Sequence, residues 1–416
     1  MEKRTLDSYE VRGKQLARFK TELEEIAKIT TQETIKAKDI TILSKCTDKK
    51  DYNVYLIRPR KRFNFAEGIP SVNLAEVDGS KISSAPRMLT EFRRNTKTLL
   101  QFGNKKKMYF CSDNLWTTLS ARSGVGGPQM SIPSLERDLL IAKGLNKDDY
   151  VKAIIRTEDG QSKIFAIMSD RYKYEPNTCL AKIVEEIDDG TLGKMKINNW
   201  FINQSIAEIY IEFPDKAKEL AKTYEFEDEF IPGVYLAKSD IGECAVKAKA
   251  TWRTGNSIFV DYEIRRRNTK NLDIDKIISD IKANMFKKYT KLPETLCDLM
   301  MIDITDPSLK TSGMSMEDIK KKSRQAVVEC LQYAFKIIKM EEAIGKTRSN
   351  AIFEQIIDSL DYSLDYTAYD IAMQIMTLPG SLAGIPRTAL HALQEACGRA
   401  PYIDYGDFAE EAILLA

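Results

Sequence analysis

Residues 243–267 read ECAVKAKATWRTGNSIFVDYEIRRR, and apolar and polar side chains alternate through both halves of this stretch. In the first half, one set of alternate positions is apolar: Cys244, Val246, Ala248, Ala250 and Trp252. The other set holds Ala245, Lys247, Lys249, Thr251 and Arg253. After the turn TGN, an apolar face is expected to continue through Ile258, Val260, Tyr262 and Ile264. A period of two predicts an antiparallel hairpin whose sheet is covered on one side only.

Other segments extend this picture in both directions. Residues 151–156 and 163–169 predict a second hairpin, because Asp159-Gly160 between them is a strong turn signal. ITILSK and YNVYLIRP, at 40–45 and 52–59, predict short strands, and residues 8–28 predict a helix. From about residue 271 the apolar period becomes helical, with Ser315 and Asp318 starting one long helix. Further helices are expected over 350–361, 366–378 and 387–397.

These patterns predict an α+β fold, with a mixed, mainly antiparallel β-sheet body, an N-terminal helix and a helical C-terminal domain. The length of 416 residues favours two or three domains. We expect an N-terminal α+β region with basic and aromatic loops over 1–115. A central antiparallel β-rich domain over 116–270 and a helical domain with an acidic end over 271–416 would follow.

The composition excludes several classes of protein. An uncharged apolar stretch long enough to span a membrane does not occur in the sequence, and the N-terminal residues lack the apolar core of a secretion signal. The seven cysteines are scattered and form no CxxC pair, which favours reduced thiols over disulfides or a zinc site. We therefore expect a cytoplasmic protein, in the host cell if its origin is mobile, without membrane association and without a cofactor.

Catalytic motifs are weak throughout the sequence. The single histidine, His391, lies in an apolar helical pattern and is expected to be a packing or surface residue. Gly345-Lys346-Thr347 resembles the end of a phosphate-binding loop, but Met340 stands where the motif needs glycine. Acidic clusters at 185–190 and 225–230, and Asp273, Asp275 and Asp280, leave a metal-dependent nuclease or phosphotransferase open. We expect no enzyme activity.

Charge is divided unevenly along the chain. Residues 353–416 contain ten acidic residues and two arginines without a lysine, although the whole chain carries a net charge of only +2. The preceding residues are therefore strongly basic. A basic body with an acidic end favours an anionic partner, and the alternative is that the acidic end only keeps the protein in solution.

Three stretches combine cations with aromatic residues. The first contributes Arg58, Arg60, Lys61, Arg62 and Phe63, and the second contributes Arg93, Arg94, Lys105, Lys106 and Lys107. The third is the polar face of the opening hairpin and its end, with Lys247, Lys249, Arg253 and Arg266. Single-stranded nucleic acid is bound in this way, since cations follow the phosphates and aromatic rings stack on unpaired bases. The alternative is that these residues only make the surface soluble.

The end of the second hairpin, Ser169-Asp170-Arg171-Tyr172, is a further candidate. Asp170 is expected to accept hydrogen bonds in a turn, while Arg171 either pairs with it or binds a phosphate in a bidentate way. We favour the structural role for the turn and keep Arg171 and Tyr172 as candidate nucleic-acid-binding residues.

Two motifs resemble a family of phage- and plasmid-borne proteins catalogued as domain of unknown function 932. The first runs from Ile155-Arg156-Thr157 through Asp159-Gly160 to residues 166–172 and Pro176-Asn177. The second is Pro232-Gly233 followed by Ser239-Asp240 and Gly242, with Arg266 and Arg267 beyond it. The resemblance covers residues 85–380 loosely and 151–267 best. It implies a mobile-element origin and a cytoplasmic location, and it assigns no catalytic residue.

We therefore expect a phage- or plasmid-type protein that binds nucleic acid, with single-stranded DNA as the leading partner. It would act in DNA metabolism by annealing or protection, without catalysis. The alternative is a phage interaction or assembly protein, or an inhibitor of a host defence system, that uses its basic and acidic surfaces for protein contacts. A homo-oligomer is left open by both.

Overall fold

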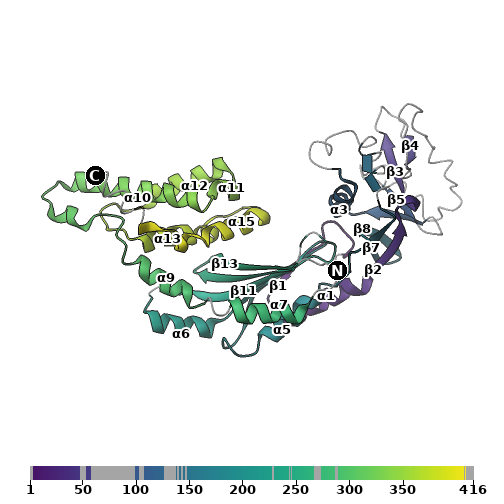
Figure 1. The fold of residues 1–416 in the computed structure, drawn as a ribbon, viewed down its shortest axis with the longest axis horizontal. Helices are drawn as coiled ribbons and strands as arrows, with labels where there is room; N and C mark the ends of the chain where they lie inside the picture. The colour runs from purple at the N-terminus through teal and green to yellow at the C-terminus, as the bar shows by residue number, and fades with distance from the viewer. Residues whose placement is uncertain are drawn as a thin grey trace.

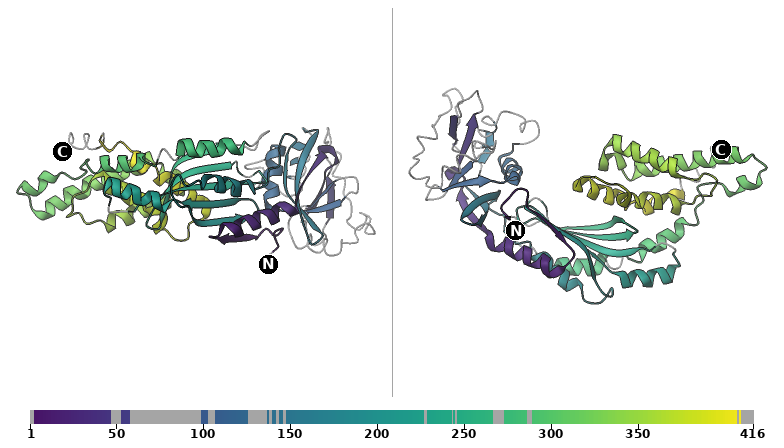
Figure 2. Two further views of the ribbon diagram at one scale, coloured as in Figure 1. Left: turned by 90° about the horizontal axis from the view of Figure 1, so that it is seen from below. Right: turned by 180° about the vertical axis from the view of Figure 1, so that it is seen from behind.

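The protein folds into three parts that follow one another along an arc in the computed structural model (Figures 1 and 2). A seven-stranded sheet forms one end, a six-stranded sheet the middle and a group of helices the other end. Apart from a few isolated positions, the residues that the structure describes are 3–46, 53–57, 99–102, 107–125, 148–226, 229–242, 246–266, 273–285 and 289–406.

The six-stranded sheet is antiparallel throughout. In spatial order its strands are β1 (Glu10–Gly13), β9 (Lys196–Asn203), β10 (Ala207–Glu212), β11 (Ile231–Lys238), β12 (Val246–Thr254) and β13 (Ser257–Arg266). The hairpin predicted from the opening stretch is confirmed as β12 and β13. Its predicted core face is confirmed as well, since Val246, Ala248, Ala250 and Trp252 are all buried in one apolar cluster.

Helices cover this core face along the outer side of the arc (Figure 1). They are α1 (Leu16–Ile29), α5 (Cys179–Ile187), α6 (Pro214–Tyr224), α7 (Ile274–Asp280) with the π-helical turn Ile281–Met285, and α9 (Lys291–Leu299). Phe19 of α1, Leu180 of α5 and Leu296 of α9 are fully buried there. Each such side chain contributes about 1.5–3 kcal/mol by leaving water.

One part of the hairpin prediction is wrong. Trp252 lies opposite Phe259, but Ala250 lies opposite Tyr262, because the register shifts between Ala250 and Thr251. The extra residue in β13 is a β-bulge, and it reverses the alternation within the strand. Phe259 therefore faces the core, whereas Ile258 lies on the opposite face, next to a cluster of Tyr210, Tyr235 and Ala237.

The seven-stranded sheet is mixed. Its strands in spatial order are β2 (Thr30–Lys36), β7 (Tyr150–Glu158), β8 (Gln161–Ser169), β6 (Lys107–Cys111), β5 (Leu99–Phe102), β3 (Thr41–Cys46) and β4 (Asn53–Ile57). β6 and β8 pair in parallel, and α3 (Asp113–Ser123) packs beside them. The predicted β7–β8 hairpin is confirmed, and Asp159 and Gly160 have φ of 50° and 73°, as a type I′ turn requires.

The strands are grouped differently from the predicted domains. The seven-stranded sheet takes strands from both sides of residue 115, and β1 and α1 belong to the six-stranded unit. The predicted helix over 8–28 is wrong at its start, since Glu10–Gly13 is strand β1 and the helix begins at Leu16. Pairing between distant strands decides these groups, and local patterns do not report it.

The helical C-terminal part is present as predicted. It contains α10 (Met316–Ile337), α11 (Met340–Ile344), α12 (Lys346–Ser359), α13 (Ala368–Met376), α14 (Leu378–Ser381) and α15 (Arg387–Cys397). Short 3-10 turns lie at Ala37–Asp39, Pro307–Thr311 and Ala400–Tyr402. Ser315 caps α10 by accepting from Asp318 N, which confirms the predicted start of this helix. Within the described part of the chain, every helix is too short or too polar to cross a membrane.

Candidate functional site

Most of the first two basic stretches lies outside the described residues. This holds for Arg58, Arg60, Lys61, Arg62, Phe63, Arg93, Arg94, Lys105 and Lys106. Lys107 and Arg266 are placed only as backbone, at the start of β6 and the end of β13. The strands next to these stretches nevertheless restrict where each stretch begins and ends.

Those neighbouring strands bring the start of the first basic stretch and the 105–107 part of the second to one end of the seven-stranded sheet. Ile57, the last residue of β4, lies opposite Ile42 of β3, and Ile42 lies opposite Leu100 of β5. β4 and β5 therefore run in the same direction, with Ile57 and Leu100 in one row. β4 ends at Ile57 and β5 ends at Phe102, so the segments that follow these two strands both begin at this end of the sheet.

The third stretch is not an open platform. Lys249 is 2% exposed, and its ammonium donates to Glu395 Oε1 of α15 at 2.5 Å and lies 5.3 Å from the Tyr235 ring. Arg253 Nε donates to Glu212 Oε1 at 2.7 Å. The expectation that this sheet is covered on one side only is therefore wrong. Lys247, farther along β12, is partly exposed.

A charged cluster joins α15 to this second face of the sheet. Glu208 of β10 is 3% exposed, accepts from Arg387 Nη2 and lies 3.6 Å from His391 Nε2. Burial alone would raise the pKa of Glu208, but the contacts with His391 and Arg387 outweigh it and lower that pKa. Tyr210 Oη donates to Gln394 Oε1 at 3.3 Å, and burial raises the pKa of Tyr210. These contacts with Glu208 and Tyr210 join α15 to β10 and hold the helix in place.

Two glycines let the C-terminal helices approach β13 closely. Gly380 N donates to Ser257 Oγ at 3.0 Å, and Ser257 Oγ donates to the carbonyl of Met376 at 2.8 Å. A Cβ atom at Gly398 would lie 1.8 Å from the carbonyl oxygen of Val260. Any larger residue at Gly398 would force the helix end away from the strand.

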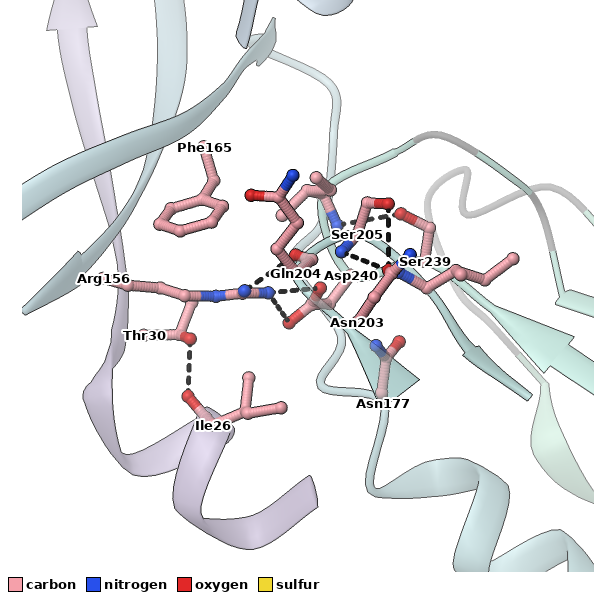
Figure 3. A network of polar contacts seen from close by, with 12 residues as sticks. Ile26, Thr30, Arg156, Phe165, Asn177, Asn203, Gln204, Ser205, Ser239 and Asp240 are labelled. Atoms are coloured by element: carbon pink, nitrogen blue, oxygen red, sulfur yellow. Dashed lines mark hydrogen bonds and ion pairs between the residues drawn. The ribbon is translucent and has the colours of Figure 1, made fainter. Parts of the chain in front are cut away.

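A buried ion pair joins the two sheets (Figure 3). Arg156 of β7 and Asp240, just after β11, are each 1% exposed. Arg156 Nη2 donates to Asp240 Oδ1 at 3.0 Å, and Nη1 donates to the carbonyl of Gln204 at 2.7 Å. The guanidinium carbon lies 4.3 Å from the Phe165 ring centroid. Each charge is thus paired, as a buried charge must be.

The motifs that carried the family resemblance meet at this junction. Tyr172 Oη donates to the carbonyl of Asp240 at 2.8 Å, and Lys238 donates to the carbonyl of Glu175 and to Asn177 Oδ1. Gly242 has a φ of 84°, and a Cβ atom there would lie 2.3 Å from Met168 Cε. These residues form a structural joint between the sheets.

Within the Ser-Asp-Arg-Tyr segment, Tyr172 therefore belongs to the joint, whereas Arg171 lies at the surface. Tyr172 is 7% exposed and its hydroxyl group is bound, so its ring is not an open stacking surface as the nucleic-acid prediction requires. Arg171 is exposed. Sequence reasoning missed the Arg156–Asp240 pair and the Glu208 cluster as contacts. Charged residues inside otherwise apolar strands, such as Lys238 and Glu208, were the signal that could have indicated them.

The acidic clusters have ordinary structural partners where they are described. Asp189 pairs with Lys282 at 2.7 Å, and this hydrogen bond lowers the pKa of Asp189 to about 2. Asp273 caps α7 by accepting from Lys276 N, and Asp275 lies 3.6 Å from Lys182. Over the described ranges, His, Cys, Asp and Glu side chains nowhere gather in threes that could hold a metal ion.

Comparison with known proteins adds no relative: no family model, no curated protein and no solved structure matches the chain.

Proposed function

We propose that the protein binds single-stranded nucleic acid at the end of the seven-stranded sheet from which the stretches at 58–63 and 105–107 continue. The observation that carries the proposal is the shared row of Ile57, Ile42 and Leu100, since it brings together the strand ends from which the basic stretches at 58–63 and 105–107 continue. Cations close together can follow a run of phosphates, and Phe63 supplies an aromatic face for a base.

The charge pattern of the rest of the molecule supports this choice of surface. Lys249 and Arg253 are engaged with Glu395 and Glu212, so their charge is neutralised within the protein. The stretches at 58–63 and 105–107 contain no acidic residue of their own. Binding there would suit a phage or plasmid protein that anneals or protects single strands without catalysis.

Fluorescence anisotropy with a labelled single-stranded oligonucleotide tests the proposal, with unlabelled duplex as the competitor. We expect binding that weakens steeply as salt rises, because each phosphate contact releases counterions. Changing Lys105, Lys106 and Lys107 to Ala should reduce the slope of log K against log salt by about 2, since each single-strand contact contributes about 0.7.

The chain offers a matched control for that variant. Lys320, Lys321 and Lys322 are three consecutive exposed lysines on α10, in the helical part. Changing these three to Ala removes the same charge and should leave the slope close to that of the unchanged protein. Equal losses in both variants would refute the proposed surface. Absence of binding at low salt, together with salt-sensitive self-association, would favour the alternative of a protein-interaction role.

A further inference from the structure

The first residue of β7, Tyr150, is a large aromatic side chain that remains 46% exposed. It lies opposite Lys36, the last residue of the edge strand β2. Directly opposed residues in an antiparallel pair share a face, with Cβ atoms about 4.5–5.5 Å apart. An exposed ring and an exposed lysine are therefore neighbours at this end of the seven-stranded sheet.

Further cations lie close to the ring. Lys152 is two residues along β7 and so shares the face of Tyr150, and its ammonium donates to the carbonyl of Tyr172 at 2.5 Å. This bond places Lys152 beside the segment that contains Arg171, which is exposed. The same turn also contains the exposed acid Asp170, which would repel a phosphate.

We propose that Tyr150 is a stacking site for one unpaired base, with Lys36 binding the phosphate on one side and Arg171 reaching the phosphate on the other. This inference rests on the proposed function. A nucleotide in a single strand fits the arrangement because it offers both a flat base and flanking negative charges. The ring is already held at the surface by a paired strand, so binding needs little ordering of the protein.

Tyr150 would give the bound nucleic acid a second contact, separate from the contact at residues 105–107. Phe110 and Cys111, the last residues of β6, lie opposite Lys163 and Ile164 near the start of β8, and the two strands run in parallel. Lys107 therefore lies at the level where β8 begins, whereas Tyr150 precedes Val151, which lies opposite Ser169 at the end of β8. The two contacts are therefore at opposite ends of the sheet. Nine residues of β7 separate those ends, a span of roughly 30 Å at about 3.3 Å per residue.

Substitutions at Tyr150, measured with the same anisotropy assay, test the inference. Tyr150→Phe keeps the aromatic face and should bind as the unchanged protein does. Tyr150→Leu keeps an apolar side chain of similar size but loses that face, and it should bind about 5- to 150-fold more weakly. Neither change should alter the thermal unfolding temperature much, because the side chain is half exposed.

Charge variants give an independent measurement. Lys36→Ala should lower the salt slope by about 0.7, whereas Tyr150→Leu should leave the slope unchanged. Asp170→Asn should tighten binding, since it removes the repelling carboxylate. Equal affinities for Tyr150→Leu and Tyr150→Phe, with the unchanged protein still binding, would overturn the stacking site alone. Absence of binding by the unchanged protein would overturn the proposed function together with this inference.

Discussion

Replacing Asp240 by Asn should destabilise the joint between the two sheets strongly. The substitution keeps the size of the side chain but removes the negative charge that pairs with Arg156, and both residues are 1% exposed. Breaking a buried pair costs about 3–5 kcal/mol, because the remaining charge stays buried without compensation. Arg156 would keep its hydrogen bond to the carbonyl of Gln204, at 2.7 Å, and its contact with the Phe165 ring, at 4.3 Å. We therefore expect the lower end, about 3 kcal/mol.

A double-mutant cycle separates the pair from the rest of the joint. Arg156→Met removes the cation and leaves a side chain of comparable length. If the pair is coupled, Arg156→Met combined with Asp240→Asn should lose less stability than the sum of the two single changes, by roughly 2 kcal/mol. The exposed pair Lys20–Glu185, with its atoms 2.5 Å apart, is the control, and its cycle should show little or no coupling because solvent screens the two charges.

Urea unfolding followed by circular dichroism measures these free energies. For Asp240→Asn the urea concentration at the unfolding midpoint should fall, while the dependence of the free energy of unfolding on urea should stay the same. That result would show that the substitution changes stability and leaves the surface exposed on unfolding unchanged. A loss below about 1 kcal/mol for Asp240→Asn would refute our reasoning. It would mean that Arg156 finds full compensation without the carboxylate.

Three further predictions follow from other contacts. Gly398→Ala should cost at least about 2 kcal/mol in the same unfolding assay, because its Cβ would lie 1.8 Å from the carbonyl oxygen of Val260. The folded state lowers the pKa of Glu208, so the ionised side chain stabilises the fold fully above about pH 4.5. That stabilisation is lost as the pH falls through the lowered pKa. The free energy of unfolding that Glu208→Gln costs at neutral pH should therefore become smaller in acid. Burial raises the pKa of Cys179 to about 11 and of Cys330 to about 12, so both thiols should resist a thiol reagent at about pH 8 until urea unfolds the chain.

Local patterns predicted one face of the central sheet and failed on the other. The alternation from Val246 to Trp252 correctly located the core face, because burial follows the period of a strand. The same alternation suggested that Lys249 is open to solvent. Its partner Glu395 lies 146 positions away in sequence, and a period of two carries no information about such a contact. The bulge in β13 likewise follows from its pairing with β12.

The candidate site was predictable in composition more than in geometry. The basic stretches near Arg58 and Lys105 were evident from the sequence, and the register of β4, β3 and β5 was needed to bring their ends together. Tyr150 gave no signal, since a tyrosine at the start of a strand is more often partly covered.

The close fit of α14 and α15 against β13 limits where the chain can be divided. β13 is the outermost strand of its sheet and is ten residues long. A fragment ending near residue 270 would lose both helices and leave that strand's hydrogen-bonding groups as a template for another chain. Such a fragment would tend to aggregate by joining sheets edge to edge. The helical part thus protects this edge strand, and we expect shortened versions that lack it to aggregate more readily.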